Sequence, residues 1–130
     1  MSKAINWPSQ FRDEVLGEDT AGLHCALRLG RMYYENQYWV PDEVVDIRVN
    51  HLKIRKAKIV GELKLCPIKD LSATDLAQYK STLRTPEAVA AFLAGNYQQP
   101  VDANTEVTVV YYKNMPIVPE DVEVQDDSHM

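Results

Sequence analysis

The sequence predicts one α+β domain, built on a small, mostly antiparallel, barrel-like β-sheet with short helices in its connections. Three observations lead to this prediction. Several segments alternate apolar with polar residues, which is typical of strands covered on one face. Helix-start signals precede three other short segments. The chain has 130 residues, 45% of them hydrophobic, which suffices for one domain that folds without a metal or a disulfide.

The strand patterns cover residues 23–29, 44–49, 53–65 and 106–113. Asn50 and His51 form a plausible turn before the third of these segments, since Asn tolerates a positive φ angle. Gly61 lies inside the third segment and indicates a bulge or a close backbone approach. Residues 31–41 are aromatic and polar, and we interpret them as a loop or an irregular strand. The side chains expected to be buried are Leu27, Val45, Ile47, Ile59, Leu63, Phe92, Val107 and Val109.

Three short helices are expected, over residues 8–16, 72–80 and 86–94. Pro8 suits a first helical position, where its missing N–H costs nothing. Ser72, followed three residues later by Asp75, has the spacing of a capping box. Thr85 is a good N-cap for the third helix, and Gly95 is expected to end it.

The net charge of −5 is concentrated at the C-terminus. Residues 119–130 carry five of the 19 acidic residues and none of the 14 basic ones, so the body, residues 1–118, is formally neutral. The charge of the whole chain therefore does not exclude an anionic partner. We predict that residues 1–118 form the domain and that residues 119–130 are a disordered acidic tail.

No apolar run is long enough to span a membrane, and the first residues lack the apolar core of a signal peptide. Without an export signal, Cys25 and Cys66 are expected to be reduced thiols. We therefore expect a cytoplasmic protein without a membrane partner, and a monomer.

Five pieces of the sequence occur in an order that resembles a known family. They are Phe11 to Gly17, Arg28 in the first strand, Pro41 to Val49, Asp70-Leu71-Ser72 with Asp75-Leu76, and Tyr97 with the strand through Val107, Val109 and Tyr111. This order resembles the ASCH domain, a branch of the PUA-like β-barrel superfamily, over most of residues 7–113. The resemblance implies a small barrel that binds RNA or nucleosides in a cleft beside it.

Some small members of that family hydrolyse an acylated cytidine with a Lys, a Thr and a Glu. By the resemblance, the Thr position here is Ala26 and the Lys position is Leu23, while the Glu falls near Gln78 or Lys80. Attack on a carbonyl needs a nucleophile and a base within mutual reach. We therefore predict no activity on acylated cytidine and favour a non-catalytic role. A hydrolase with a rearranged site remains an alternative.

Other chemical signals are weak. His24 and Cys25 are adjacent in a predicted strand, so their side chains point to opposite faces and cannot activate each other. The most plausible role of Cys25 is a buried structural thiol. The His and Cys residues lack the close spacing of a zinc site, and the glycines form no phosphate-binding motif, so no metal and no cofactor is predicted.

A basic stretch over residues 48–58 suggests contacts with phosphate, and tyrosines and a tryptophan lie nearby at positions 33–39. We predict a module that binds single-stranded RNA or a nucleotide in a basic cleft. Its predicted site residues are Arg28, Arg48, Lys56, Lys58 and His24. Two explanations compete with this prediction. The lysines can simply form a solvated strand face, and the aromatic rings can simply pack in the core or at its rim. A protein-interaction domain is a further alternative.

Overall fold

The structure is a computed structural model that describes residues 3–123. Its strands are β1 (Ala4–Trp7), β2 (His24–Leu29), β3 (Val44–Val49), β4 (Leu52–Ile59), β5 (Lys64–Pro67) and β6 (Glu106–Asn114). Its α-helices are α1 (Arg12–Gly17), α2 (Met32–Glu35), α3 (Ala73–Gln78) and α4 (Pro86–Tyr97). Single 3-10 turns occur at η1 (Ser9–Phe11), η2 (Ile68–Asp70) and η3 (Pro119–Asp121).

The strands form one sheet in the order β1-β3-β4-β6-β2, with β5 also paired to β6. All neighbours are antiparallel except β1 and β3, which run parallel. The predicted α+β class with a mostly antiparallel sheet is confirmed. Within residues 3–123 the sheet is not closed into a barrel, because β1 pairs only with β3 and β2 only with β6.

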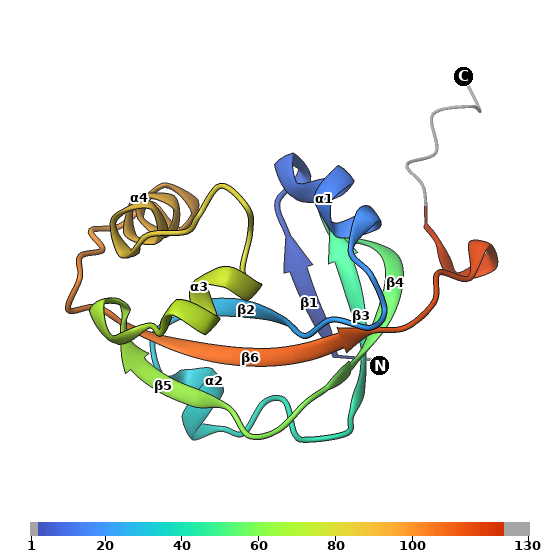
Figure 1. The fold of residues 1–130 in the computed structure, drawn as a ribbon, viewed down its shortest axis with the longest axis horizontal. Helices are drawn as coiled ribbons and strands as arrows, with labels where there is room; N and C mark the ends of the chain where they lie inside the picture. Colours follow the sequence, from blue (N-terminus) through green and yellow to red (C-terminus); the bar gives the residue numbers. More distant parts are fainter. Residues whose placement is uncertain (1–2, 124–130) are drawn as a thin grey trace.

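The helices lie on two sides of the sheet. Figure 1 shows α3 and α4 above β2 and β6, and α2 on the opposite side. The predicted capping box is present at α3, where the Ser72 side chain accepts from the Asp75 N–H and the Asp75 carboxylate accepts from the Ser72 N–H. The Thr85 side chain likewise accepts from the Ala88 N–H at the start of α4. Both starts are therefore fixed by local sequence.

Three predicted boundaries are wrong, each for a local reason. Helix α4 continues past Gly95 and ends where Gln98 adopts the left-handed conformation, with φ of 54°. The expected strand over 53–65 is broken into β4 and β5, because Gly61 has φ of +71° and turns the chain. The stretch predicted to be a loop or an irregular strand contains α2.

The two faces of the sheet follow from its register, since residues directly opposite on neighbouring strands point to the same side. We call the inner face the one that carries Arg28, Thr108, Tyr112, Ala57 and Ile47. Except for Arg28, these five side chains are almost completely buried. The outer face is covered by α3 near Cys25 and is open to solvent near Lys58.

The buried side chains form one hydrophobic cluster that includes most of the residues predicted from alternation. Leu27, Val45, Ile47, Ile59, Leu63, Val107 and Val109 are buried, as expected, whereas Phe92 is only partly buried. The cluster also takes in residues that the patterns did not single out, above all Trp7, Trp39 and Tyr112. The core therefore extends from the sheet to the segments before β2 and after α2.

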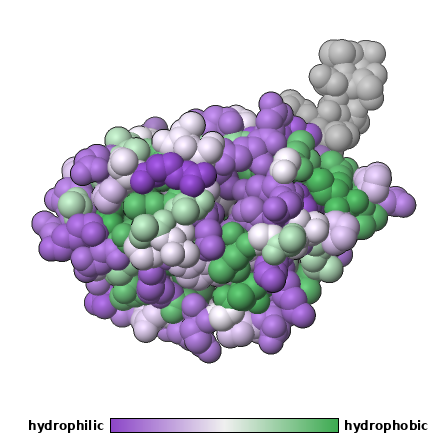
Figure 2. All heavy atoms as spheres, viewed as in Figure 1, coloured by the Kyte–Doolittle hydropathy of each residue, from purple (hydrophilic) through white to green (hydrophobic). Residues whose placement is uncertain are grey.

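The segment after β6 lies along β4. The Met115 N–H donates to the Lys56 carbonyl (2.9 Å) and the Glu123 N–H to the Lys53 carbonyl (2.6 Å), and Val122 packs against the core. Residues 119–123 are thus placed on the domain, contrary to the expectation of a disordered tail from 119; residues 124–130 lie outside the described part. Met115, Ile117 and Val118 are exposed, and a hydrophobic patch appears there in Figure 2.

Candidate functional site

A cleft of about 170 Å³ opens between the two end strands of the sheet, β1 and β2, and reaches α4. We call it the seam cleft. Arg28 lies at this seam: its Nη1 donates to the Leu27 carbonyl and its Nη2 to the Asn6 carbonyl, both at 2.8 Å. The second bond bridges β2 to β1 through a side chain, where a closed barrel would use backbone pairing. The aromatic rings that line the cleft are Trp7, Tyr33, Tyr79, Phe92 and Tyr97.

The charge on Arg28 has no carboxylate partner in the described part of the chain. Its contacts there are the two carbonyls and the Trp7 ring, whose centroid lies 5.5 Å from the guanidinium carbon. An arginine that contacts only carbonyl dipoles and an aromatic face keeps a positive field that favours an anionic or electron-rich ligand. The cleft therefore joins a cation to several flat apolar surfaces.

Two amides complete the polar character of the seam cleft. Asn6 and Asn96 line it, from β1 and α4 respectively. The Asn6 side-chain oxygen accepts from the His51 N–H at 2.8 Å. Amide side chains offer both donors and acceptors, so they can read the edge of a planar ring. Burial raises the pKa of Tyr79, which keeps that phenol protonated near neutral pH.

His24 lies on the same face as Arg28 but belongs to a different cluster. Its Nε2 is 3.4 Å from an Asp19 carboxylate oxygen, and its Nδ1 is 3.9 Å from Glu18. The imidazole also packs against the Tyr112 ring at 5.8 Å. His24 does not line the seam cleft, so of the predicted site residues only Arg28 does.

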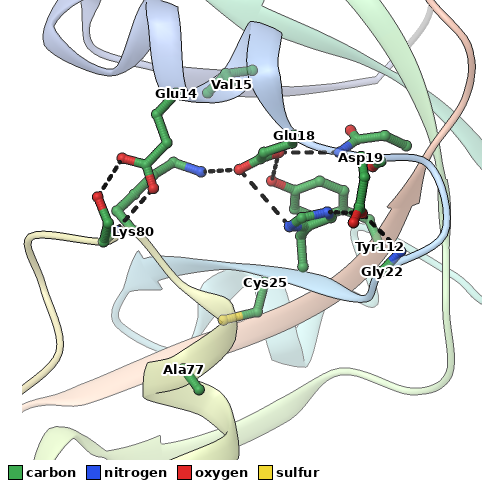
Figure 3. A network of polar contacts seen from close by, with 12 residues as sticks. Glu14, Val15, Glu18, Asp19, Gly22, Cys25, Ala77, Lys80 and Tyr112 are labelled. Carbon is green, nitrogen blue, oxygen red and sulfur yellow. Dashed lines mark hydrogen bonds and ion pairs between the residues drawn. The ribbon is translucent and has the colours of Figure 1, made fainter.

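Glu18 is the centre of that buried cluster, which Figure 3 displays. It accepts from the Lys80 ammonium at 2.7 Å and from the Asn114 amide at 3.1 Å. The Lys80 side chain is 0% exposed, and its Nζ lies 3.8 Å from the centroid of the Trp7 ring. The Trp7 ring, which lines the seam cleft, therefore packs against a buried ion pair.

Arg48, Lys56 and Lys58 lie on the outer face, away from Arg28. The guanidinium of Arg48 contacts the Asp46 carboxylate at 3.2 Å, which neutralises much of its charge. Lys56 and Lys58 have the same parity in β4 and face opposite to Ala57. The structure does not bring these three together with Arg28, because β2 pairs with β6 and not with β3 or β4.

The thiol of Cys25 is structural, as predicted. It is buried on the face opposite to His24, and it donates to the Asp75 carbonyl at 3.2 Å. Burial raises its pKa to about 12, so almost no thiolate forms near neutral pH. Both cysteines are free. Cys25 is therefore no candidate nucleophile.

Sequence reasoning missed most of the cleft. Trp7 and Asn6 lie in β1, a four-residue strand whose alternation is too short to separate from chance. Asn96 was placed beyond the expected end of α4. Tyr33 was noticed among the aromatic residues, but nothing local indicated that it would face Arg28.

Comparisons of the chain with protein-family models, with curated proteins and with solved structures found no match. Within the described residues, no group of three or more His, Cys, Asp or Glu side chains is placed to hold a metal ion. None of the helices in residues 3–123 has the length and apolar character needed to cross a membrane.

Proposed function

We propose that this protein is a non-catalytic module that binds a nucleotide or single-stranded RNA, with one unpaired base in the seam cleft. The observation that carries the proposal is the arrangement of Arg28 and the aromatic rings around one hollow. Proteins that read single strands stack bases on aromatic side chains and on arginine, and contact phosphate with cations. A cleft of about 170 Å³ suits one base better than a larger ligand.

The composition of the cleft favours binding over catalysis. Its lining contains no Ser, Thr, Cys, Lys, His, Asp or Glu within the described residues. A hydrolase needs a nucleophile or an activated water with a base in reach. Leu23 and Ala26, at the Lys and Thr positions of the resembling hydrolases, supply neither. We therefore favour binding over a hydrolase with a rearranged site.

The resemblance to the ASCH domain and the PUA-like superfamily supports the same function. The described chain has the expected helices α3 and α4 between β5 and β6, and it adds β1 and α2 to the expected elements. The open sheet departs from a closed barrel. We propose the relationship on the order of the five sequence pieces and on Arg28, which lines the seam cleft.

The test is an NMR titration with the four ribonucleoside monophosphates and short single-stranded RNA. We expect shifts at the backbone amides of Asn6, Trp7 and Asn96, and binding that weakens as salt rises. Arg28→Lys keeps the charge but loses the planar fork, so binding should weaken about tenfold, equivalent to about 1.4 kcal/mol.

Lys58→Gln is the matched control, because it removes a cation from the outer face without touching the cleft. It should leave binding nearly unchanged. Shifts confined to the outer strands, or no shifts at millimolar ligand, would contradict the proposal. A folded spectrum for Arg28→Lys is required, since Arg28 also bonds the Asn6 carbonyl.

A further inference from the structure

A second hollow adjoins the seam cleft and shares one wall with it. This groove of about 290 Å³ is lined by Met32, Tyr33, Asn36 and Tyr38, from α2 and the loop that follows it. Tyr33 also lines the seam cleft. The two hollows are therefore neighbours that share one aromatic side chain. We call the second hollow the α2 groove.

The ring that the hollows share is held by other aromatic side chains. Tyr33 stacks on Trp39 with ring centroids 5.0 Å apart and planes 6° apart. Tyr38 packs edge-on against both of them, at 5.2 Å and 4.9 Å. Trp39 is only 1% exposed, so this trio is anchored in the core. A preformed aromatic surface costs little conformational entropy when a ligand stacks on it.

Folding does not explain why the α2 groove is so apolar. The Met32 side chain is 70% exposed, and Tyr38 remains 37% exposed although it touches two other rings. Scattered apolar residues on a surface need no explanation, but here they line a hollow that shares Tyr33 with another aromatic one. Asn36 adds an amide that can bond the edge of a base.

We infer that the α2 groove binds a second, neighbouring unpaired base, so that the ligand is a single strand at least two nucleotides long. This inference rests on the proposed function of the seam cleft. Successive bases of a single strand are covalently tied at close spacing, and a single strand can splay them into adjacent pockets. The seam cleft and the α2 groove are adjacent pockets of this kind, because Tyr33 lines both. Stacking of a base on an aromatic ring in either pocket tolerates any base identity.

The experiment compares a dinucleoside monophosphate with the matching mononucleotides, measured by NMR titration and by tryptophan fluorescence. A second stacked base should strengthen binding by at least fivefold, which corresponds to about 1 kcal/mol. The Met32 methyl group and the Asn36 amide should shift with the dinucleotide and not with the mononucleotide.

Met32→Glu places a negative charge in the α2 groove on an exposed side chain, so the fold should be unaffected. This variant should lower dinucleotide affinity to the mononucleotide level and leave mononucleotide affinity unchanged. Tyr34→Ala is the matched control, because Tyr34 lies on the same short helix, is 37% exposed and lines neither hollow. It should bind both ligands like the unaltered protein.

The outcomes separate the two claims. Equal affinity for mononucleotide and dinucleotide would overturn the second base site while the seam cleft stands. Failure of both ligands to bind would remove the proposed function and this inference with it. Concentration-dependent shifts of the Met32 methyl without ligand would assign the α2 groove to a second copy of the chain, and would also overturn it.

Discussion

Lys80 is fully buried beside the largely buried carboxylate of Glu18, which is an unusual place for a lysine. Taking an ammonium out of water costs several kcal/mol, and the attraction to Glu18 has to offset that cost. Further hydrogen bonds from Asn114 and Tyr112 stabilise the carboxylate, and the Trp7 ring lies against the ammonium. The pair joins the segment after α1 to the segment after α3.

A double-mutant cycle on this pair should show strong coupling. Lys80→Met or Glu18→Gln alone should lower the free energy of unfolding by about 3–5 kcal/mol, because each leaves one buried charge without its partner. The double variant should lose less than the sum of the two. Urea unfolding measures all four proteins. Single variants that cost under about 1 kcal/mol would mean that the pair is not buried in solution.

At the scale of single residues, alternation assigned the buried set of β3 but could not assign Arg28. The pattern shows that Arg28 points opposite to Leu27, yet both faces of β2 are covered in a curved sheet, so the polar position need not face solvent. Lys80 lies after α3 in no periodic pattern. Its burial depends on Glu18, which lies 62 residues away in sequence. Patterns within a short segment therefore cannot predict it.

Among the elements, the hairpin of β3 and β4 has a turn with an unfavourable backbone conformation at one of its two residues. Asn50 and His51 both have positive φ, at 50° and 68°. This conformation suits the right-handed twist of a two-residue hairpin and favours Asn followed by Gly. A histidine with its Cβ is strained there. The sequence pattern predicted the turn correctly, but it did not predict the backbone strain at His51.

His51→Gly should therefore stabilise the protein by about 0.5–1 kcal/mol and raise the melting temperature by about 2–5 °C. The backbone hydrogen bonds of this residue do not need its side chain: its N–H donates to the Asn6 side-chain oxygen, and its carbonyl accepts from Arg48. Calorimetry measures the change. Asn50→Gly is the control and should gain less, since Asn tolerates positive φ. A lower melting temperature for His51→Gly would refute the strain.

The elements that sequence reasoning missed are the shortest ones. Strand β1 has four residues and is recognisable only through its parallel pairing with β3, a contact distant in sequence. Helix α2 also has four residues, with no side-chain cap at its start. Longer elements with caps, such as α3 and α4, were found because their start signals are local. An element is therefore predictable from the sequence when residues close together in the chain define it, and not when contacts between distant residues do.

For the molecule as a whole, the segment after β6 extends the contacts of the C-terminal part along β4. It covers the part of β4 that β6 does not reach, with bonds at Lys53 and Lys56. Val122 adds apolar contact with the core. The domain in the structure thus extends at least to residue 123, beyond the expected boundary at 118.

Two truncations should separate these roles. Removal of residues 119–130 should destabilise the protein by about 1–2 kcal/mol, from the lost bonds to β4 and the contact of Val122. Removal of residues 124–130 alone should change little, because that segment holds two acids and few apolar groups. Thermal unfolding compares both with the full chain. Equal stability of the two truncations would show that residues 119–123 contribute nothing.

The contacts of residues 4–7 and of residues 115–123 with one hairpin have a consequence for how the protein folds. Residues 4–7 can pair only after residues 46–49 have been synthesised. The contacts along the free side of β4 can form only after Met115 and Glu123 have been synthesised. Contacts between residues distant in sequence slow folding, because the entropy of closing the chain is lost before the burial of apolar surface stabilises the fold. A growing chain on the ribosome therefore leaves this side of β4 uncovered until residues 115–123 have emerged.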